Sequence, residues 1–466
     1  MTTPRFRMPH TLVIVGGLVA VVLVMTWIVP SGTYERAEKD GRLVTLPGTY
    51  QPVEKDYLGP HWLLTAPLKG FVDGALIIGF LLVIGGAFSV IQATGSIEFA
   101  IKRVTAALTA HPFLEKLTIP VLMVIFSLAG SVFGMAEEVI PFVLIFVPLA
   151  LSLGYDSIVG VSIPFLGAAS GFAAAFFNPF TVGIAQGLTG LPLYSGLGYR
   201  LLTWVLGTTL MITWVMLYAR RVKRRPESSP VYDIDRARED HAAFAAGDAG
   251  PWTRGHVAVL ALFALSMGLL VWGILGHAWF IEEIGALFLA MGLVIGAVAG
   301  LRPSAIATSF LAGARDMVGV ALIIACGRAL LILAREGQVL DTVLYASSMA
   351  VSGMPKVVAA QMMFGVQSGI NFFIHSGTAQ AALTMPIMAP LADLVGLTRQ
   401  TTVYAFQLCE FINPILPTSA VTMGVLGMAR IPWDRWARWF LPLMLALIVL
   451  SLVLLVPPVL WHWGPF

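Results

Sequence analysis

Two stretches of the sequence decide the fold, FGMAEE at residues 133–138 and HSGTAQ at residues 375–380. Each leads into a Pro-Leu-Ala triplet and a glycine, and each is followed by an Asn-Pro pair, at Asn178-Pro179 and Asn413-Pro414. These small and polar residues interrupt segments that are otherwise apolar enough to sit in lipid. Helices interrupted at matching positions in two halves of a chain are the best sequence indication of the substrate site of a secondary transporter. The sequence therefore predicts transport.

The composition predicts an all-α polytopic membrane protein. The 466 residues are 58% hydrophobic and only 11% charged, whereas soluble domains carry about 25% charged residues. Apolar runs of about 20 residues, each long enough to cross a bilayer, recur between Leu12 and Val456. The alternating ten-residue segments of a β-barrel are absent from the sequence.

Basic residues predict the topology. Arg5 and Arg7 precede the first apolar run, and a basic cluster from Arg220 to Arg225 follows the run that ends near Tyr218. Cytoplasmic loops are enriched in Lys and Arg, so we expect a cytoplasmic N-terminus and a cytoplasmic cluster. The first run is too long for a signal peptide and is expected to remain as an anchor. A topology signal explains the cluster better than nucleic-acid binding does.

These features divide the chain into three parts. Residues 1–218 are expected to form a first membrane repeat with an external loop at 31–70. Residues 219–254 are rich in charge and proline, and we expect a cytoplasmic, partly disordered linker there. Residues 255–466 are expected to form a second membrane repeat.

The charges also predict how the two repeats are oriented. The last span of the first half ends at the basic cluster, whereas its counterpart begins after Arg430, Arg435 and Arg438. Corresponding spans therefore run in opposite directions, which predicts inverted-topology repeats with broken helices. Residues 117–130 and 358–369 lead into the interruptions, and we expect re-entrant hairpins there, because irregular backbone at membrane depth must be buried in protein or line a cavity.

Glu137 and Glu138 give the strongest indication of a site. An ionised residue at membrane depth costs on the order of 2.5–3.5 kcal/mol on insertion scales, so it must face a partner, a cavity or a ligand. The functional interpretation is the handling of a cation: a proton, a sodium ion or an ammonium group of the substrate. The structural alternative is a buried ion pair, for instance with His375 or Arg328.

The second half carries neutral polar residues where the first carries carboxylates. Ala379 and Gln380 stand at the positions of Glu137 and Glu138, and Ser376 and Thr378 lie close by. One arm would then supply negative charge and the other neutral hydrogen bonds, which suits an amino acid. Arg328 and Arg335 lie near the end of a span, and we expect structural roles for both.

The two Asn-Pro pairs are expected to contribute to the same site. Proline removes a helical hydrogen bond and frees a carbonyl group, which together with the Asn amides and nearby hydroxyls offers oxygen ligands. Sodium near Asn178 and Asn413 is one option for a coupling ion, and a proton is the other. Weaker candidates are Asn371 and Glu410. The remaining hydroxyl candidates near the pairs are Thr181, Thr418 and Ser419.

Longer motifs resemble a known family. They are WIVPSGTYER at residues 27–36, GMAEE at 134–138, GYDS at 154–157 and NPFTVGIAQ at 178–186. With these motifs the chain resembles, over nearly its whole length, the DcuC-type carriers of the ion-transporter superfamily, in their YfcC-like, basic amino acid antiporter branch. The resemblance implies a homodimer in which a scaffold domain carries a mobile, elevator-like transport domain with two hairpins.

The function expected from these observations is secondary active transport of amino acids by alternating access, with exchange of basic amino acids such as arginine and ornithine in first place. A proton- or sodium-coupled C4-dicarboxylate carrier is the alternative, and a channel, a sensor or an intramembrane enzyme are remote ones. We expect no enzymatic activity, because the common hydrolase and protease motifs are absent. The expected partners are a small-molecule substrate and membrane lipid, not nucleic acid, and the expected location is the inner membrane.

Overall fold

The computed structural model describes residues 11–39, 42–238, 251–277, 279–351 and 353–464. Within these ranges the chain is mainly helical, and nine helices or helix pairs are long and apolar enough to cross a membrane. The protein is therefore a multi-pass membrane protein, as its composition predicts. Arg5 and Arg7, which predict the orientation of the N-terminus, lie outside the described residues.

The first half begins with a membrane helix and a small strand-forming loop. A long helix that is broken at Gly74 and an amphipathic helix follow. The next four helices, which are interrupted at residues 133–138 and at Asn178-Pro179, form the interrupted unit of this half. The elements are α1 (Thr11–Ile28), β1 (Gly32–Thr33), β2 (Arg36–Lys39), β3 (Arg42–Thr45), β4 (Gln51–Pro52), α2 (Trp62–Asp73), α3 (Ala75–Ala93), α4 (Ser96–Thr109), α5 (Pro112–Phe133), α6 (Ile140–Ser152), α7 (Ser157–Ala173), α8 (Ile184–Thr189) and α9 (Leu197–Arg224).

The second half begins with two membrane helices and then repeats the element order of the first from its broken helix onward. Between the halves, α10 (Tyr232–Arg236) belongs to the linker. The elements of the second half are α12 (Arg254–His277), α13 (Ile281–Val298), α14 (Pro303–Asp316), α15 (Val318–Glu336), α16 (Leu340–Val351), α17 (Lys356–Asn371), α18 (Gly377–Val395), α19 (Arg399–Leu408), α20 (Ala420–Met428), α21 (Trp433–Leu454) and α22 (Val456–Leu460).

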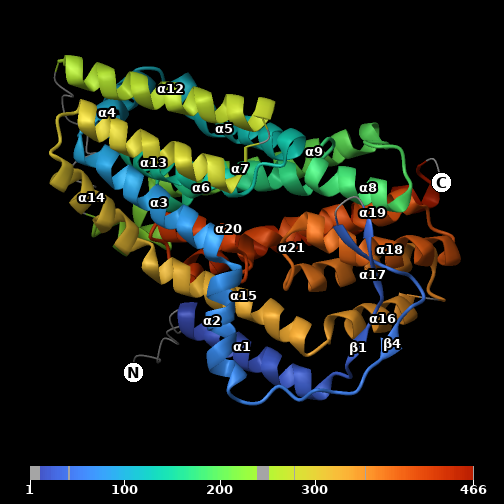
Figure 1. The fold of residues 1–466 in the computed structure, drawn as a ribbon. Helices are drawn as coiled ribbons and strands as arrows, with labels where there is room; N and C mark the ends of the chain where they lie inside the picture. The colour runs from blue at the N-terminus through green and yellow to red at the C-terminus, as the bar shows by residue number, and fades with distance from the viewer. Residues whose placement is uncertain (1–10, 40–41, 239–250, 278, 352, 465–466) are drawn as a thin grey trace, which may run out of the picture.

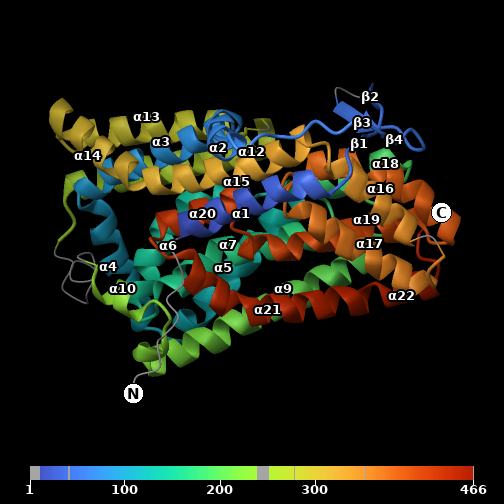
Figure 2. The ribbon, with the colours of Figure 1, turned by 90° about the horizontal axis from the view of Figure 1, so that it is seen from below.

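The corresponding units lie at opposite ends of the molecule. Figure 1 shows α5 and α6 toward the end that carries α4, whereas α17 and α18 lie toward the end that carries β1 and β4. The broken helices exchange partners between the halves, because α2 packs on α15 and α14 packs on α3. The same arrangement is seen from below in Figure 2, with α16 to α19 gathered beside the strands. The tips of the two interrupted units therefore meet near the middle of the molecule.

Glycines allow the helices of the first unit to approach closely. A Cβ atom added at Gly171 of α7 would lie 1.7 Å from the Ser127 carbonyl oxygen of α5, and one added at Gly130 would lie 2.2 Å from that of Ala168. Small residues at such positions are what lets membrane helices pack backbone to backbone. Next to these contacts, the hydroxyls of Ser127, Ser170 and Thr208 bond to one another at 2.8–3.2 Å.

The described part of the linker is folded onto both halves. Asp156 caps α7 by accepting from the Val159 amide at 3.0 Å, the usual role of Asp just before a helix. Asp235 of α10 accepts from the Ser157 amide at 2.8 Å, and Ser229 donates to Asp156 at 2.6 Å. The disorder expected over residues 219–254 therefore does not extend to residues 219–238, because buried hydrogen bonds fix them, while 239–250 lie outside the described residues.

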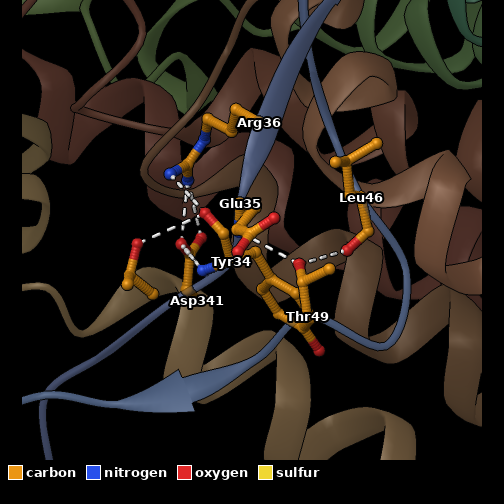
Figure 3. A network of polar contacts seen from close by, with 7 residues as sticks. Tyr34, Glu35, Arg36, Leu46, Thr49 and Asp341 are labelled. Carbon is orange, nitrogen blue, oxygen red and sulfur yellow. Dashed lines mark hydrogen bonds and ion pairs between the residues drawn. The ribbon is translucent and has the colours of Figure 1, made fainter.

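The loop after α1 is fixed by polar contacts with α16. Strand β1 pairs with β4 and β2 pairs with β3, both antiparallel. Arg36 binds both carboxylate oxygens of Asp341, at 2.8 and 2.9 Å, and the Tyr34 amide donates to the same group, as Figure 3 shows. Burial and the charge of Asp341 raise the pKa of Tyr34 to about 12. The end of the region expected to be an external loop, residues 62–70, is helical and belongs to α2.

Candidate functional site

A cavity of about 730 Å³ lies where the two interrupted units meet. Its volume falls in the range of about 300–1,000 Å³ that is typical of small-molecule sites. Both expected segments line it, together with residues of α3, α7, α15, α20 and the turn between α12 and α13. The polar and charged residues that line the cavity are Glu137, Glu138, Arg328, His375, Ser376, Thr378, Glu410, Asn413, Thr418, Ser419 and Thr422.

The first-half wall is a turn between α5 and α6. Gly134 ends α5 with φ +74°, a left-handed conformation that glycine adopts without strain. A Cβ atom at this position would also lie 2.8 Å from the Asn178 side chain. Glu137 and Glu138 follow in a 3-10 turn, where Glu138 is 6% exposed and accepts from the Ala136 amide at 2.8 Å. The turn therefore holds one carboxylate by a backbone bond and brings the other to the cavity.

The second-half wall is the connection between α17 and α18. Ser376 caps α18 by accepting from the Ala379 amide at 3.4 Å, and His375 Nε2 lies 2.8 Å from the Thr418 hydroxyl. Thr378 donates to the Phe180 carbonyl at 3.0 Å, so this wall is bonded directly to the first-half Asn-Pro break. The hydroxyls of this wall are neutral, in contrast to the acidic pair opposite.

The second Asn-Pro break carries a third carboxylate. Glu410 is 2% exposed, and the Asn413 amide donates to one of its oxygens. Its other oxygen, Oε1, has no hydrogen-bond partner among the described residues, and neither has Asn413 Oδ1. Two buried oxygens without a donor are costly unless a ligand or a proton satisfies them.

Three carbonyl groups at the second Asn-Pro break accept hydrogen bonds from side chains of the protein. The Trp436 indole donates to the Pro414 carbonyl at 2.7 Å, and the Trp433 indole donates to that of Ile415 at 2.8 Å. The Thr422 hydroxyl donates to the Asn413 carbonyl at 2.9 Å. These three carbonyls are therefore not free for an ion, and the side-chain oxygens are the better ligands.

A cluster of buried amides lies behind the second-half wall. The Gln380 amide donates to the side chain of Gln367 at 2.8 Å and accepts from the Asn371 amide at 3.1 Å. Gln367 in turn donates to the Thr384 hydroxyl at 2.9 Å. Gln380 and Asn371 are 0% exposed and are not among the residues that line the cavity. Their hydrogen bonds hold α17 and α18 together.

The first Asn-Pro break also lies mainly behind the cavity wall. Asn178 is 0% exposed, and its Oδ1 accepts from the amides of Phe180 and Thr181 at 2.8 and 3.3 Å. Asn178 Nδ2 and the Thr181 hydroxyl have no partner among the described residues. Pro179 and Phe180 are the residues of this break that line the cavity.

The structure thus brings together eight of the twelve residues expected at the site. Those that line the cavity are Glu137, Glu138, Ser376, Thr378, Glu410, Asn413, Thr418 and Ser419. Those buried outside its lining are Asn178, Thr181, Asn371 and Gln380. Sequence reasoning did not place Arg328, Trp279 and Phe280 in the site, although an arginine inside an apolar run is itself a signal of function.

No group of three or more His, Cys, Asp or Glu side chains that could hold a metal ion occurs within the described ranges. Of the two cysteines, Cys409 is buried beside the amide cluster and Cys326 is half-buried. Neither lines the cavity.

Comparisons with known proteins agree with these features. Residues 8–459 match the family described as DcuC, C4-dicarboxylate anaerobic carrier. The chain is 37% identical over 494 residues to the Escherichia coli K12 protein named "Putative basic amino acid antiporter YfcC", with 97% of each chain covered. It is 30% identical to an uncharacterized protein of Haemophilus influenzae, again with 97% of each covered.

Two solved transporter structures resemble the fold distantly. The Alcanivorax borkumensis YdaH transporter matches with a TM-score of 0.42 and 17% identity, over 98% of this chain and 100% of that one. Neisseria gonorrhoeae MtrF, described with a class of antimetabolite efflux pumps, matches with a TM-score of 0.38 and 15% identity, over 97% and 95%.

Proposed function

The chain belongs to the DcuC family of C4-dicarboxylate anaerobic carriers, and from this premise we propose that it is a secondary active transporter that exchanges basic amino acids such as arginine and ornithine. The charge of the cavity carries this proposal. Three carboxylates, those of Glu137, Glu138 and Glu410, line it against one guanidinium. Such a surface favours a cationic substrate over a dianion. The name of the Escherichia coli relative, a basic amino acid antiporter, supports the same substrate class.

The proposed mechanism is alternating access between two inverted repeats. The matching order of α2 to α9 and α14 to α21 supports it, as do the opposite ends at which α5–α6 and α17–α18 lie. In such transporters one unit rocks or slides against another around a site at the midplane. Elevator-like movement of a transport domain on a scaffold is the form we propose, because the cavity lies between the interrupted units and the residues of the α12–α13 turn.

We propose Glu410 as the group that carries a coupling ion, a proton or sodium. Glu410 Oε1, Asn413 Oδ1, Asn371 Oδ1 and the Thr181 hydroxyl are all buried without a partner among the described residues. Glu410 Oε1 and the Thr181 side chain both lie within 4 Å of the Cβ position of Gly377, so they share one small region. Oxygen ligands of this kind suit a hard cation. A proton on Glu410 would instead supply one O–H donor, enough for one neighbouring oxygen.

A coupled C4-dicarboxylate carrier is the second candidate. The description of the family favours it, and so does the same cluster of oxygens, since a bound cation would offset part of the charge of a dianion. The carboxylates of Glu137 and Glu138 would then bind ions rather than the substrate. We further propose that the protein is a homodimer in the inner membrane, as the resemblance to its family implies, which chemical cross-linking in native membranes can test.

Uptake of labelled arginine into proteoliposomes preloaded with ornithine tests the proposed function, at zero voltage and equal pH on both sides. We expect rapid uptake that requires internal ornithine. Uptake of succinate but not arginine would overturn the proposal in favour of the dicarboxylate carrier, and flux without saturation by a counter-substrate would indicate a channel.

Glu138→Gln separates the roles of the acidic pair. We expect a large loss of arginine affinity, because the variant removes a charge from the cavity. A change in coupling with the affinity for arginine intact would show that the carboxylate does not bind the substrate amine. Glu98→Gln is the matched control, because Glu98 pairs with Lys102 at 2.7 Å on α4 and does not line the cavity.

A further inference from the structure

Arg328 is the cavity residue whose role the acidic pair does not explain. It lies near the middle of α15, a 19-residue helix that is apolar enough to cross a membrane and largely buried. A guanidinium at such a depth is costly unless it meets a partner or serves a function. Arg328 is the one Lys or Arg among the described residues that line the cavity.

The contacts of Arg328 leave most of its hydrogen-bonding capacity unused. Its one ion pair within the described part of the chain joins Nη1 to Asp73 Oδ2 at 3.5 Å, which is longer than a charge-assisted hydrogen bond of about 2.7–2.9 Å. A guanidinium carries five donors in a fork that fits a carboxylate at two points. The Arg435–Asp233 pair in this same protein has that two-point geometry, with Nη1 and Nη2 each donating to one carboxylate oxygen, at 2.8 and 3.0 Å.

Asp73 is a weak counter-ion for Arg328. It is the last residue of α2, next to the break at Gly74, and its side chain is 36% exposed. The Arg328 side chain is 34% exposed, so both groups remain partly open. A partly exposed ion pair with one long contact exchanges its partner at little cost.

We propose that Arg328 binds a carboxylate group of the transported substrate, and that Asp73 holds the guanidinium in place until the substrate arrives. This inference rests on the proposed function, in which the substrate is a basic amino acid. Arg328 would then bind the α-carboxylate at two points, while Glu137 and Glu138 bind the cationic side chain. The cavity thereby selects amino acids over amines that lack a carboxylate.

His375 is a poorer candidate for the same role. Its Nε2 is already within hydrogen-bond distance of the Thr418 hydroxyl, so it offers a single remaining ring nitrogen. A neutral imidazole is also a weaker ligand for a carboxylate than a guanidinium, which stays protonated at all physiological pH values.

Binding of arginine and of agmatine, which is arginine without its carboxylate, tests the inference on purified full-length protein. Four proteins are compared: the native protein, Arg328→Gln, Asp73→Asn and Arg335→Gln. The last is the matched control, because Arg335 lies on the same helix and does not line the cavity. Thermal unfolding without ligand verifies that each variant is folded.

We expect the native protein and Arg335→Gln to prefer arginine over agmatine by about 10- to 100-fold, the range of a charge-assisted hydrogen bond. Arg328→Gln should lose this preference through weaker binding of arginine, while agmatine binds as before or more tightly, because a like charge has been removed from the cavity. Asp73→Asn should bind arginine several-fold more tightly, because a competing carboxylate has been removed. An arginine preference that survives in Arg328→Gln would overturn the inference, and if that variant does not fold, an Asp73→Asn protein with unchanged or weaker arginine affinity would do so.

Succinate distinguishes failure of the inference from failure of the proposed function. Tight binding of succinate without arginine by the native protein, lost in Arg328→Gln, would remove the proposed amino acid substrate and keep Arg328 as the carboxylate ligand. Arginine exchange that persists with an unchanged preference in Arg328→Gln would keep the function and remove the role of Arg328. A folded native protein that binds neither compound would overturn both.

Discussion

The two interrupted units share an order of elements but differ in chemistry and in packing. The first unit presents Glu137 and Glu138 to the cavity, and its helices α5 and α7 touch backbone to backbone at Gly130 and Gly171. In the second unit the connection between α17 and α18 presents neutral hydroxyls, the Asn-Pro break presents the single carboxylate of Glu410, and the amide of Gln380 lies behind the wall in a closed network.

The space beside the glycines also differs between the two units: it is filled by backbone atoms in the first unit and open in α17 of the second. A Cβ atom added at Gly365 or Gly369 of α17 would meet no other atom within 4 Å. The comparison teaches that a repeated order of helices fixes where a site lies but not which half supplies its charge. We therefore expect changes in the first unit to act on the substrate or on helix packing, and changes in the buried amide network of α17 and α18 to act mainly on stability.

The largest effect is expected when both carboxylates of the first unit are removed. Glu137→Gln combined with Glu138→Gln should lower the rate of arginine exchange by about 1,000-fold, since each charge-assisted bond is worth roughly 1.5–3 kcal/mol. The temperature of unfolding in detergent should change little, because glutamine keeps the acceptor for the Ala136 amide. Exchange within tenfold of the native rate would contradict the assigned charge asymmetry.

The next effect concerns the close packing of the first unit. Gly171→Ala should destabilise the protein by about 3 kcal/mol, because the new methyl group would overlap the Ser127 carbonyl and a backbone atom cannot move aside cheaply. Gly369→Ala is the matched change in the second unit and should stabilise by about 0.5–1 kcal/mol, the usual gain for alanine inside a helix. Thermal unfolding of both variants checks the pair, and equal effects would contradict the difference in packing.

Sequence patterns predicted the multi-pass helical fold, because runs of apolar residues are a local signal. They also predicted the cavity wall at Glu137 and Glu138, because a carboxylate in an apolar run needs a partner. They could not separate Thr378, which lines the cavity, from Gln380, which does not. Residues that are two positions apart along a helix face different sides of it. Which of these sides faces the cavity depends on how α17 and α18 pack.

Arg328 is the opposite case, a residue that lines the cavity although the sequence predicted a structural role for it. We expected it near the end of a span, but it lies near the middle of α15, and the approach of α2 to α15 places it in the cavity wall. The linker is another example. Its composition indicates disorder, while its fold between residues 226 and 236 depends on buried bonds to the N-terminus of α7 that no local pattern contains.

A smaller effect is expected in the amide network of the second unit. Gln380→Leu should destabilise the protein by about 1–2 kcal/mol, because the amides of Gln367 and Asn371 would be left buried without their partner. The KM for arginine should stay within about twofold, since Gln380 does not line the cavity. Thermal unfolding and exchange kinetics measured on the same preparation check both statements. A large rise in KM without loss of stability would instead make Gln380 a ligand.

The smallest effect is expected where the linker meets the second half. Arg435 donates to both carboxylate oxygens of Asp233 at 2.8 and 3.0 Å, and these bonds lower the pKa of Asp233. Because the pKa is lower in the folded state, the pair stabilises the protein above the unfolded pKa of about 3.9 and is lost as the pH falls through the folded value. Both side chains are exposed by more than a third, so solvent limits the coupling to below about 1 kcal/mol.

A double-mutant cycle of Asp233→Asn and Arg435→Gln, followed by thermal unfolding at pH 7 and near pH 3, measures this coupling. We expect it to be present at pH 7 and strongly reduced near pH 3. Asp235→Ala should cost more at pH 7, because Asp235 is 5% exposed and accepts from the Ser157 amide at the start of α7, and alanine removes that acceptor. A larger contribution from the exposed Asp233–Arg435 pair than from the buried bond between Asp235 and the Ser157 amide would contradict this expectation. The linker would then be anchored to the second half rather than to the first, and the first unit would not be the more tightly held of the two.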